Sequence, residues 1–221
     1  MTLPLRSAGR RLSTLTVLLF MAAASGQAPE TGREQALRAI TSVDAMTRRD
    51  AAVRLGEVGA MGDVTQLLEV LRDNDLDLRR EAERAIWRIW ARSGDAKIDA
   101  LYQKGVDEME SGDLKSAVAT FTRVIAQKPD FAEGWNKRAT LYFLVGDLRK
   151  SLADCDEVIK RNPNHFGALA GYAQIYARLG SYELALRYAR RALAVNPNLL
   201  GIQESIELLE RLIEERRQHT V

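Results

Sequence analysis

The sequence predicts an all-α fold, a right-handed α-solenoid superhelix built from antiparallel helix pairs. Prolines and glycines recur at a fixed interval of 34 residues: Pro129, Pro163 and Pro197, and Gly112, Gly146 and Gly180. A period of this size is typical of stacked copies of one supersecondary unit. Runs of Ala, Leu, Glu and Arg favour helix. No segment shows the short alternating runs, bounded by turn residues, that indicate strands.

Each 34-residue unit is predicted to form two helices joined by a tight turn. In the first unit, helix A spans residues 98–111 and helix B spans residues 114–127. Gly112-Asp113 lies between them, where glycine adopts the positive φ that ends one helix and aspartate caps the next. Gly146-Asp147 and Gly180-Ser181 recur at the same place. The three periodic prolines stop the B helices, because proline cannot continue a helix.

Residue types also repeat where the helices must meet. Small residues align on the A helices (Gly105, Ala139 and Ala173) and on the B helices (Ala117, Ser151 and Ala185), followed by Phe121, Cys155 and Ala189, then Val124, Val158 and Ala192. Together these positions resemble the tetratricopeptide repeat, in three consecutive units over about residues 98–198. The resemblance implies a stack whose A helices line a concave face. Glu108 departs from the pattern, since the other units have Tyr142 and Tyr176 there.

The sequence divides into four parts: a signal peptide (1–26), an N-terminal helical segment (27–95), the three repeats (96–198) and a C-terminal helix (199–221). The last part carries an apolar stripe at helical spacing, formed by Ile202, Ile206, Leu209 and Ile213. Glutamates cover its other side. This pattern predicts an amphipathic helix that caps the open end of the repeat stack.

The N-terminal segment has a repeat of its own, in residues 33–93. The stretch that begins at Arg48-Arg49 recurs 31 residues later at Arg79-Arg80. This pattern is similar to HEAT-like repeats, and it predicts four helices, at about 34–45, 48–58, 63–72 and 77–92. Only Gly94-Asp95 separates the segment from the repeats, so we expect little independent motion. Trp90 is expected to pack inward, and one continuous superhelix is expected to form.

The first 26 residues have the pattern of a secretory signal peptide. Arginines precede an apolar run from Leu15 to Ala24, and small residues follow, so we expect cleavage near Gly26 and a periplasmic or secreted protein. The alternative is an uncleaved anchor in the inner membrane. A membrane-spanning helix needs about 20 apolar residues, and the run from Leu12 to Ala24 is 13 residues long, interrupted by Ser13, Thr14 and Thr16. Membrane contact is therefore expected only if this segment stays attached.

Charge argues against nucleic acid as a partner. Removing residues 1–26 takes away three arginines and no acid, so 29 basic and 30 acidic residues remain of the 32 and 30 in the whole chain. Binding to nucleic acid requires a basic face, which this balance does not indicate. Cys155 is the one cysteine of the sequence, and we expect a buried, unreactive thiol.

The sequence contains no pattern that predicts catalysis, a metal site or a cofactor. Its two histidines, His165 and His219, have no second metal ligand at a useful spacing. His165 lies in a turn after Pro163, where a solvated or capping side chain is expected. Residues 73–77 imitate the start of a calcium loop, but Leu78 occupies the place of the required glycine. A protein that is not an enzyme is therefore predicted.

The predicted partner-binding groove is the face of the A helices that turns away from the B helices. It comprises nine residues: Tyr102, Val106, Met109, Asn136, Thr140, Phe143, Ala170, Gln174 and Ala177. Amides would bond to a peptide backbone, and aromatic rings would supply contact area. The alternative is a packed inner surface that binds nothing. Relatives that clamp the acidic tail of cytosolic chaperones need Lys, Asn and Arg at places that here hold Tyr102, Val106, Gly167 and Gly171, so that clamp is not expected.

These patterns favour an exported, non-enzymatic adaptor that binds a protein or peptide partner. Two alternatives stay open. The HEAT-like segment is similar to that of subunits that attach bilins, which suggests an enzyme-associated or chromophore-lyase-like role, although fold alone does not imply function. A membrane-tethered structural protein would result if the N-terminal segment is retained.

Overall fold

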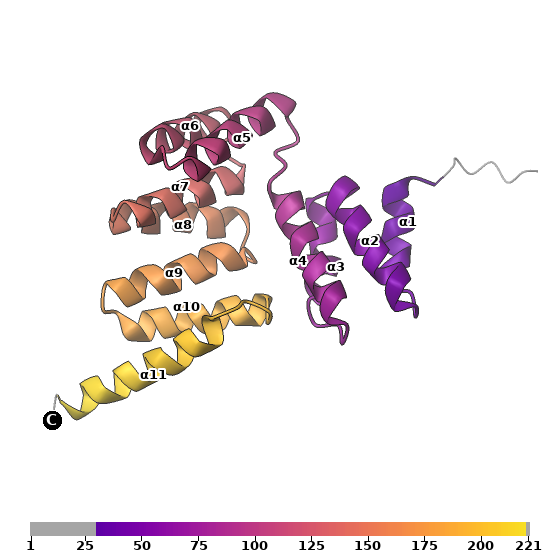
Figure 1. Ribbon diagram of the computed structural model, residues 1–221. Helices are drawn as coiled ribbons and strands as arrows, with labels where there is room; N and C mark the ends of the chain where they lie inside the picture. Colours follow the sequence, from indigo (N-terminus) through magenta and orange to yellow (C-terminus); the bar gives the residue numbers. More distant parts are fainter. Residues whose placement is uncertain (1–29, 220–221) are drawn as a thin grey trace, which may run out of the picture. The chain divides into compact units, whose positions relative to one another are not determined.

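The computed structural model describes residues 30–219, and the predicted signal peptide lies outside them (Figure 1). Helices alone form the secondary structure of the described residues, which confirms the all-α fold. The N-terminal segment contains α1 (Gly32–Ala39), α2 (Ala45–Val58), a short 3-10 turn η1 (Met61–Asp63), α3 (Val64–Val70) and α4 (Leu76–Trp90). The repeats and the C-terminal part contain α5 (Ala96–Glu110), α6 (Leu114–Gln127), α7 (Ala132–Leu144), α8 (Leu148–Arg161), α9 (Phe166–Arg178), α10 (Tyr182–Val195) and α11 (Ile202–Gln218).

Helices α5 to α10 form three successive pairs with the predicted turns between them (Figure 1). Gly112, Gly146 and Gly180 have φ values of 82°, 83° and 69°, which a residue with a side chain rarely adopts. The carboxylates of Asp113 and Asp147 accept the backbone N–H groups of Ser116 and Lys150, as N-caps do. Ser181 stands at the same place before α10 but makes no side-chain cap hydrogen bond with a described residue.

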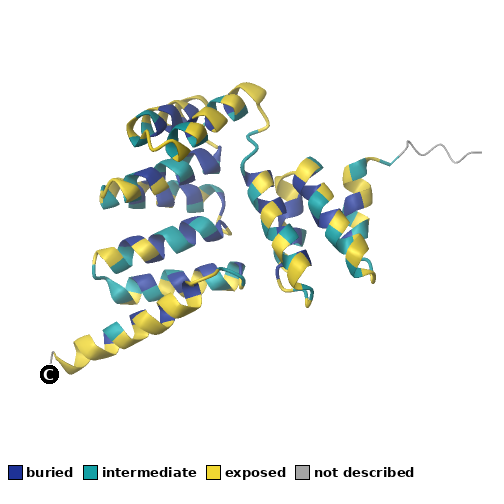
Figure 2. Cartoon of the chain, in the orientation of Figure 1, coloured by how far each residue is buried: buried dark blue, intermediate teal, exposed yellow. Residues whose placement is uncertain are grey.

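The repeat core uses the residues that the sequence pattern aligned. Dark blue bands in Figure 2 mark the buried faces along which the paired helices meet. Phe121 is fully buried, and a Cβ placed on Gly105 would lie 2.8 Å from its ring, so this glycine lets α5 and α6 approach. The hydroxyl of Ser151 donates to the carbonyl of Ala139 over 2.8 Å. Small residues at these positions are therefore needed for close helix packing.

The C-terminal helix α11 packs as its apolar stripe predicts. Ile202, Ile206, Leu209 and Ile213 are all buried, and the remaining side of the helix is exposed. Gly201, with a φ of 74°, lets the chain turn into α11. The helix covers α10, the last helix of the third repeat.

The N-terminal segment contains helices in all four predicted places and has its own apolar core. Helix α1 ends at Ala39 and not near residue 45 as expected, because Asp44 already caps the next helix, α2. Leu55, Leu67, Leu71, Leu78 and Ile86 are fully buried between the helices. Whether these helices are HEAT-like repeats stays a prediction. None of the described helices combines the length and the apolar character that crossing a bilayer demands.

The junction between the segment and the repeats differs from the expected continuous superhelix. Trp90 is 3% exposed, which confirms that it packs inward, and its ring stacks on His165 with centroids 4.3 Å apart. Trp87 meets Phe166 edge to face. The side-chain amide of Asn198 donates to the carbonyl of Leu71 over 2.8 Å. The segment therefore packs against the turns that precede α9 and α11 and does not continue the stack through α5.

Candidate functional site

The nine predicted groove residues lie on α5, α7 and α9, the A helices of the three repeats. Thr140 and Gln174 are exposed. Five others are half-buried: Val106, Met109, Phe143, Ala170 and Ala177. Tyr102 and Asn136 are buried. The face is thus open at its centre, on α7 and α9, and more closed on α5.

Tyr102 and Asn136 are buried and hydrogen-bonded inside the protein, whereas we expected both on an open groove surface. Asn136 is 8% exposed, and its amide donates to the Glu133 carboxylate over 3.0 Å. The Tyr102 hydroxyl points to the same oxygen at 3.5 Å, while its ring packs edge-on against Phe121 and Phe131. The physical reason is the buried carboxylate of Glu133, which needs hydrogen-bond donors around it.

A notch between α7 and α9 brings four of the predicted residues together: Asn136, Thr140, Phe143 and Gln174. Its floor is formed by Ser151 and Cys155 of α8. The volume is about 50 Å³, close to that of one or two water molecules of ~30 Å³ each. Val106 and Met109 instead pack on the core of the first repeat. The notch suits one protruding side chain of a partner, not a whole small molecule.

Arg178 extends this face at the end of α9, and the sequence reasoning did not include it. Its guanidinium carbon lies 4.5 Å from the centroid of the Phe143 ring, and it donates to the Phe143 carbonyl over 3.1 Å. A cation over an aromatic face is favourable. The sequence could have indicated Arg178 as part of this face, because it directly follows Ala177 on the A helix.

A deeply buried polar contact of the repeats joins Glu133 to His165. Both side chains are nearly inaccessible, with 2% and 0% exposed, and Glu133 Oε2 lies 2.9 Å from His165 Nε2. His165 Nδ1 accepts the backbone N–H of Ala168 as an N-cap, so Nε2 carries the proton that is donated to Glu133. Of the two roles expected for His165, a solvated or a capping side chain, the structure shows the cap.

The surroundings of Glu133 favour its ionised form. Burial raises the pKa of this carboxyl, but the His165 hydrogen bond, the charge of Lys137 and the Asn136 amide outweigh burial and hold the pKa below its ordinary value. Nothing in the spacing of Glu133 and His165 signals this pair in the sequence. Contact between residues 32 positions apart depends on how successive repeats nest.

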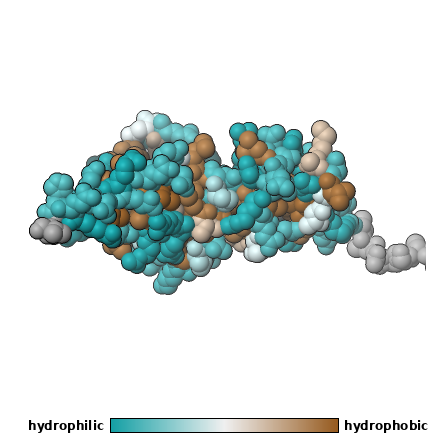
Figure 3. Space-filling model, turned by 90° about the horizontal axis from the view of Figure 1, so that it is seen from below, coloured by the Kyte–Doolittle hydropathy of each residue, from teal (hydrophilic) through white to brown (hydrophobic). Residues whose placement is uncertain are grey.

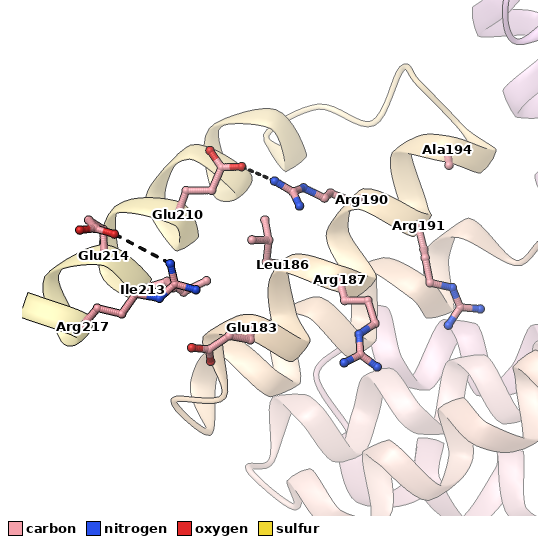
Figure 4. Close-up of a pocket in the computed structure, with 10 residues that line it drawn as sticks. All are labelled: Glu183, Leu186, Arg187, Arg190, Arg191, Ala194, Glu210, Ile213, Glu214 and Arg217. Carbon is pink, nitrogen blue, oxygen red and sulfur yellow. Dashed lines mark hydrogen bonds and ion pairs between the residues drawn. The ribbon is translucent and has the colours of Figure 1, made fainter. Parts of the chain in front are cut away.

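A wider hollow of about 680 Å³ lies between α10 and α11 (Figure 4). Leu186 and Ile213 contribute its apolar lining, and charged side chains surround them: Glu183, Arg187, Arg190, Arg191, Glu210, Glu214 and Arg217. Arg190 bonds to Glu210 across the hollow over 2.6 Å. Basic and acidic groups alternate, so the hollow has no uniform charge. Sequence reasoning had assigned no role to this place.

Apolar side chains also reach the surface outside these sites. On the face drawn in Figure 3, hydrophobic residues lie in separate areas among hydrophilic ones. Leu144, Val145 and Leu179 are each about half exposed, at the turns that follow α7 and α9. Scattered exposed apolar residues are ordinary for a protein surface and identify no site by themselves.

The described residues contain no group of three or more His, Cys, Asp or Glu side chains placed to hold a metal ion. Cys155 is 2% exposed, as expected. Burial, with the neighbouring charges of Asp154 and Asp156, raises the pKa of its thiol to about 12. The thiolate, which is the reactive form, is thus disfavoured at neutral pH.

Comparison with known proteins agrees with this geometry. Residues 102–156 and 137–198 match the tetratricopeptide repeat family. Residues 102–198 of this chain are therefore similar to tetratricopeptide repeats. A TPR repeat-containing protein of Rhizobium etli is 36% identical over 78 residues, which are 35% of this chain and 38% of that protein. The chain thus aligns with well under two thirds of this relative.

Solved structures show the same repeat fold. The first TPR of Spaghetti (RPAP3), determined with an HSP90 peptide, SRMEEVD, is 19% identical, covers 54% of this chain and 96% of its own, and superposes with a TM-score of 0.52. The Sgt2 TPR domain from Aspergillus fumigatus is 18% identical, with coverages of 56% and 83% and a TM-score of 0.53. MamA is 16% identical, with coverages of 72% and 87% and a TM-score of 0.51. At these identities the similarity establishes the fold.

Proposed function

We propose that this protein is a non-enzymatic adaptor that holds a segment of a partner protein on the face formed by α5, α7 and α9. The observation that carries the proposal is the open cluster of Thr140, Phe143 and Gln174 around the α7–α9 notch. Polar and apolar groups of different repeats converge there on one accessible place. Concave faces of helical repeats are common sites for extended ligands.

The chemistry of the face suits a peptide backbone. Thr140 and Gln174 offer a hydroxyl and an amide that donate and accept hydrogen bonds, and Phe143 supplies apolar area. Arg178 adds a positive charge beside the Phe143 ring. A side chain of the partner would enter the notch, while its backbone would run along α7 and α9. The RPAP3 structure, whose similar fold was solved with a peptide, supports this class of ligand.

Specificity is expected to differ from that of proteins that clamp acidic chaperone tails. The places of the clamping side chains hold Tyr102, Val106, Gly167 and Gly171. Tyr102 is buried and Gly167 faces Trp87, so neither position presents a charge to a ligand. We therefore expect a partner segment of mixed polar and apolar character.

Export remains part of this proposal. Residues 1–26 have the signal-peptide pattern, and cleavage near Gly26 would give a periplasmic or secreted adaptor whose HEAT-like segment, residues 27–95, precedes the repeats. Retention of residues 12–24 would instead anchor it in the inner membrane. The mass of the mature N-terminus distinguishes the two. Among the described residues, nothing favours the chromophore-lyase-like alternative.

A binding experiment tests the groove. Peptides that bind the full chain would be selected from a displayed library, and their affinities measured by calorimetry for the wild type, Thr140→Arg and Ala126→Arg. Thr140 is exposed on α7, whereas Ala126 is exposed on α6, a B helix. We expect Thr140→Arg to weaken binding at least about tenfold, a loss of ~1.4 kcal/mol, with no change for Ala126→Arg. Equal affinities for all three proteins would exclude the groove.

A further inference from the structure

Gly171 lies in the middle of α9, where glycine destabilises a helix relative to alanine. Close packing does not explain it. Apart from its own helix backbone, a Cβ at this position would have one atom within 4 Å, the Cys155 sulfur, at an ordinary 3.6 Å. Gly167, one turn earlier, differs because its Cβ would lie 2.5 Å from the Trp87 ring. A helical glycine that lowers stability with no packing reason indicates a position used for binding.

The space that Gly171 leaves free is part of the notch between α7 and α9. Gly171 and Cys155 both line this notch, so a Cβ at position 171 would stand beside the sulfur and narrow the space. The equivalent positions of the other A helices, 34 and 68 residues earlier, hold Lys137 and Gln103. Both have long side chains, and Lys137 pairs with Glu133 over 3.6 Å. Of the three repeats, the third thus lacks a side chain at this position.

The notch has an apolar floor under a polar rim. Ala139 and Cys155, which are 3% and 2% exposed, lie at its base. The Ser151 hydroxyl is also at the base, but it already donates to the Ala139 carbonyl. Thr140 and Gln174 are exposed and line the mouth. An apolar base with a few polar groups around it suits an apolar side chain whose backbone is bonded at the rim.

We propose that Gly171 makes this notch selective for a methyl-sized side chain, so that the partner segment places an alanine there. This inference rests on the proposed function, because the alanine belongs to the segment held on α7 and α9. The volume of about 50 Å³ corresponds to one or two water molecules of ~30 Å³ each. A leucine side chain is too large for it. A glycine would leave the floor without contacts.

The probes are peptides selected on the full chain from a displayed library, restricted to those whose binding Thr140→Arg weakens. In the tightest of them each position is randomised in turn, and the pools are sorted again on the wild type, Gly171→Ala and Gly62→Ala. Gly62 is exposed, outside the notch, and has no atom within 4 Å of an added Cβ, so it is the matched control. Thermal unfolding checks that each variant is folded.

We expect one peptide position at which the wild type selects alanine. Versions with glycine, alanine or leucine there are then measured by calorimetry. The alanine version should bind the wild type about fivefold or more tighter than either of the others, the scale of one methyl group in an apolar pocket. Gly171→Ala should weaken the alanine version to about the affinity of the glycine version, because the new methyl group takes its place. Gly62→Ala should leave the order unchanged.

Three results would overturn the inference while leaving the groove in place: no peptide position restricted to small residues, a leucine version as tight as the alanine version, or full affinity of Gly171→Ala for the alanine version. A different result concerns the proposed function. If Thr140→Arg weakens the binding of no selected peptide, the groove itself is wrong, and the selectivity assigned to Gly171 fails with it.

Discussion

At the scale of single residues, buried charges are held by partners from a neighbouring helix. Asp154 of α8 is buried and accepts two hydrogen bonds from the Arg138 guanidinium of α7, each over 2.8 Å. Arg138 also donates to Thr122 of α6 over 3.0 Å, so one side chain ties three helices. The Asp154 hydrogen bonds raise the pKa of Arg138. Removing either member of such a buried pair is strongly destabilising, because the other charge stays buried without its partner.

Removing one member of this pair should destabilise the protein strongly. Arg138→Met keeps much of the side-chain volume but leaves Asp154 buried without its partner, so we expect a loss of about 3 kcal/mol in the free energy of unfolding. The comparison is Arg190→Met, whose pair with Glu210 is exposed and is worth about 1 kcal/mol or less. Urea denaturation measures both variants. Similar losses for the two would contradict the buried-pair account.

The single cysteine gives a second test at this scale. Because burial raises the pKa of the Cys155 thiol to about 12, we expect no reaction with a thiol reagent such as DTNB at pH 8 in the folded protein. Denaturant should expose the thiol and give one equivalent of reaction. Rapid labelling of the folded protein would mean that the core around Cys155 opens readily.

The surroundings of two single side chains, Asn136 and His165, could not be predicted from the sequence, because a neighbouring buried side chain determines them. Asn136 occupies a groove position of its helix, as its spacing predicted, but the neighbouring Glu133 carboxylate takes its amide. His165 has the turn position that the sequence predicted, yet the Trp90 ring covers it. Helical spacing predicts which face a side chain occupies. It does not predict what a distant segment places on that face.

At the scale of elements, α4 docks on α9 at a place where only glycine fits. A Cβ on Gly167 would lie 2.5 Å from the end of the Trp87 ring. One turn further along α9, a Cβ on Gly171 would meet only the Cys155 sulfur, at an ordinary 3.6 Å. Both glycines lie in the same helix, so they form a matched pair for substitution.

The two alanine variants should therefore have opposite effects. Gly171→Ala should stabilise the protein by up to about 1 kcal/mol, because alanine favours helix. Gly167→Ala gains the same preference but displaces Trp87, so we expect a net loss of stability and an altered tryptophan fluorescence spectrum. Thermal unfolding and emission spectra measure the two effects. Equal stabilisation by both substitutions would show that α4 does not pack closely on α9.

The attachment of α1 should depend on pH. Arg33 of α1 donates to the Asp63 carboxylate over 2.6 and 2.8 Å, and this bonding lowers the pKa of Asp63 despite its burial. A lowered pKa stabilises the fold at pH values above the unfolded pKa of about 3.9. That contribution is lost as the pH falls through the lower pKa of the folded state.

The difference in stability between the wild type and Asp63→Asn should thus be largest near neutral pH and shrink below about pH 4. Denaturant unfolding between pH 7 and pH 2.5 measures it. A difference that stays constant over this range would mean that the Asp63 charge contributes nothing. Asp50→Asn, at an exposed position of α2, serves as the control for a carboxylate outside the ion pair.

At the scale of the whole molecule, the sequence predicted the helix pairs of the repeats better than the contact between the N-terminal segment and those repeats. The period of Pro129, Pro163 and Pro197 identified the helix pairs, because each pair is closed by local turns and caps. The docking of Trp87 and Trp90 against residues 165 and 166 could not be found in this way. These contacts join segments about 75 positions apart, and no period connects them. The expectation of a continuous superhelix failed for this reason.

Function at this scale depends on which face of the repeats meets the partner. The groove proposal assigns contact to α7 and α9, around Thr140 and Gln174, and none to the exposed surface of α6. Site-specific photo-crosslinking measures this contact directly. A photoreactive phenylalanine analogue would replace Thr140 in one protein and Ala126 in another, and each would be irradiated with a selected peptide ligand. Both positions are exposed, so neither substitution disturbs the core.

We predict a crosslinked product from position 140 and none above background from position 126, with the product at 140 suppressed by an excess of unlabelled peptide. Crosslinking from position 126 alone would contradict the account, because the ligand would then lie on the B helices.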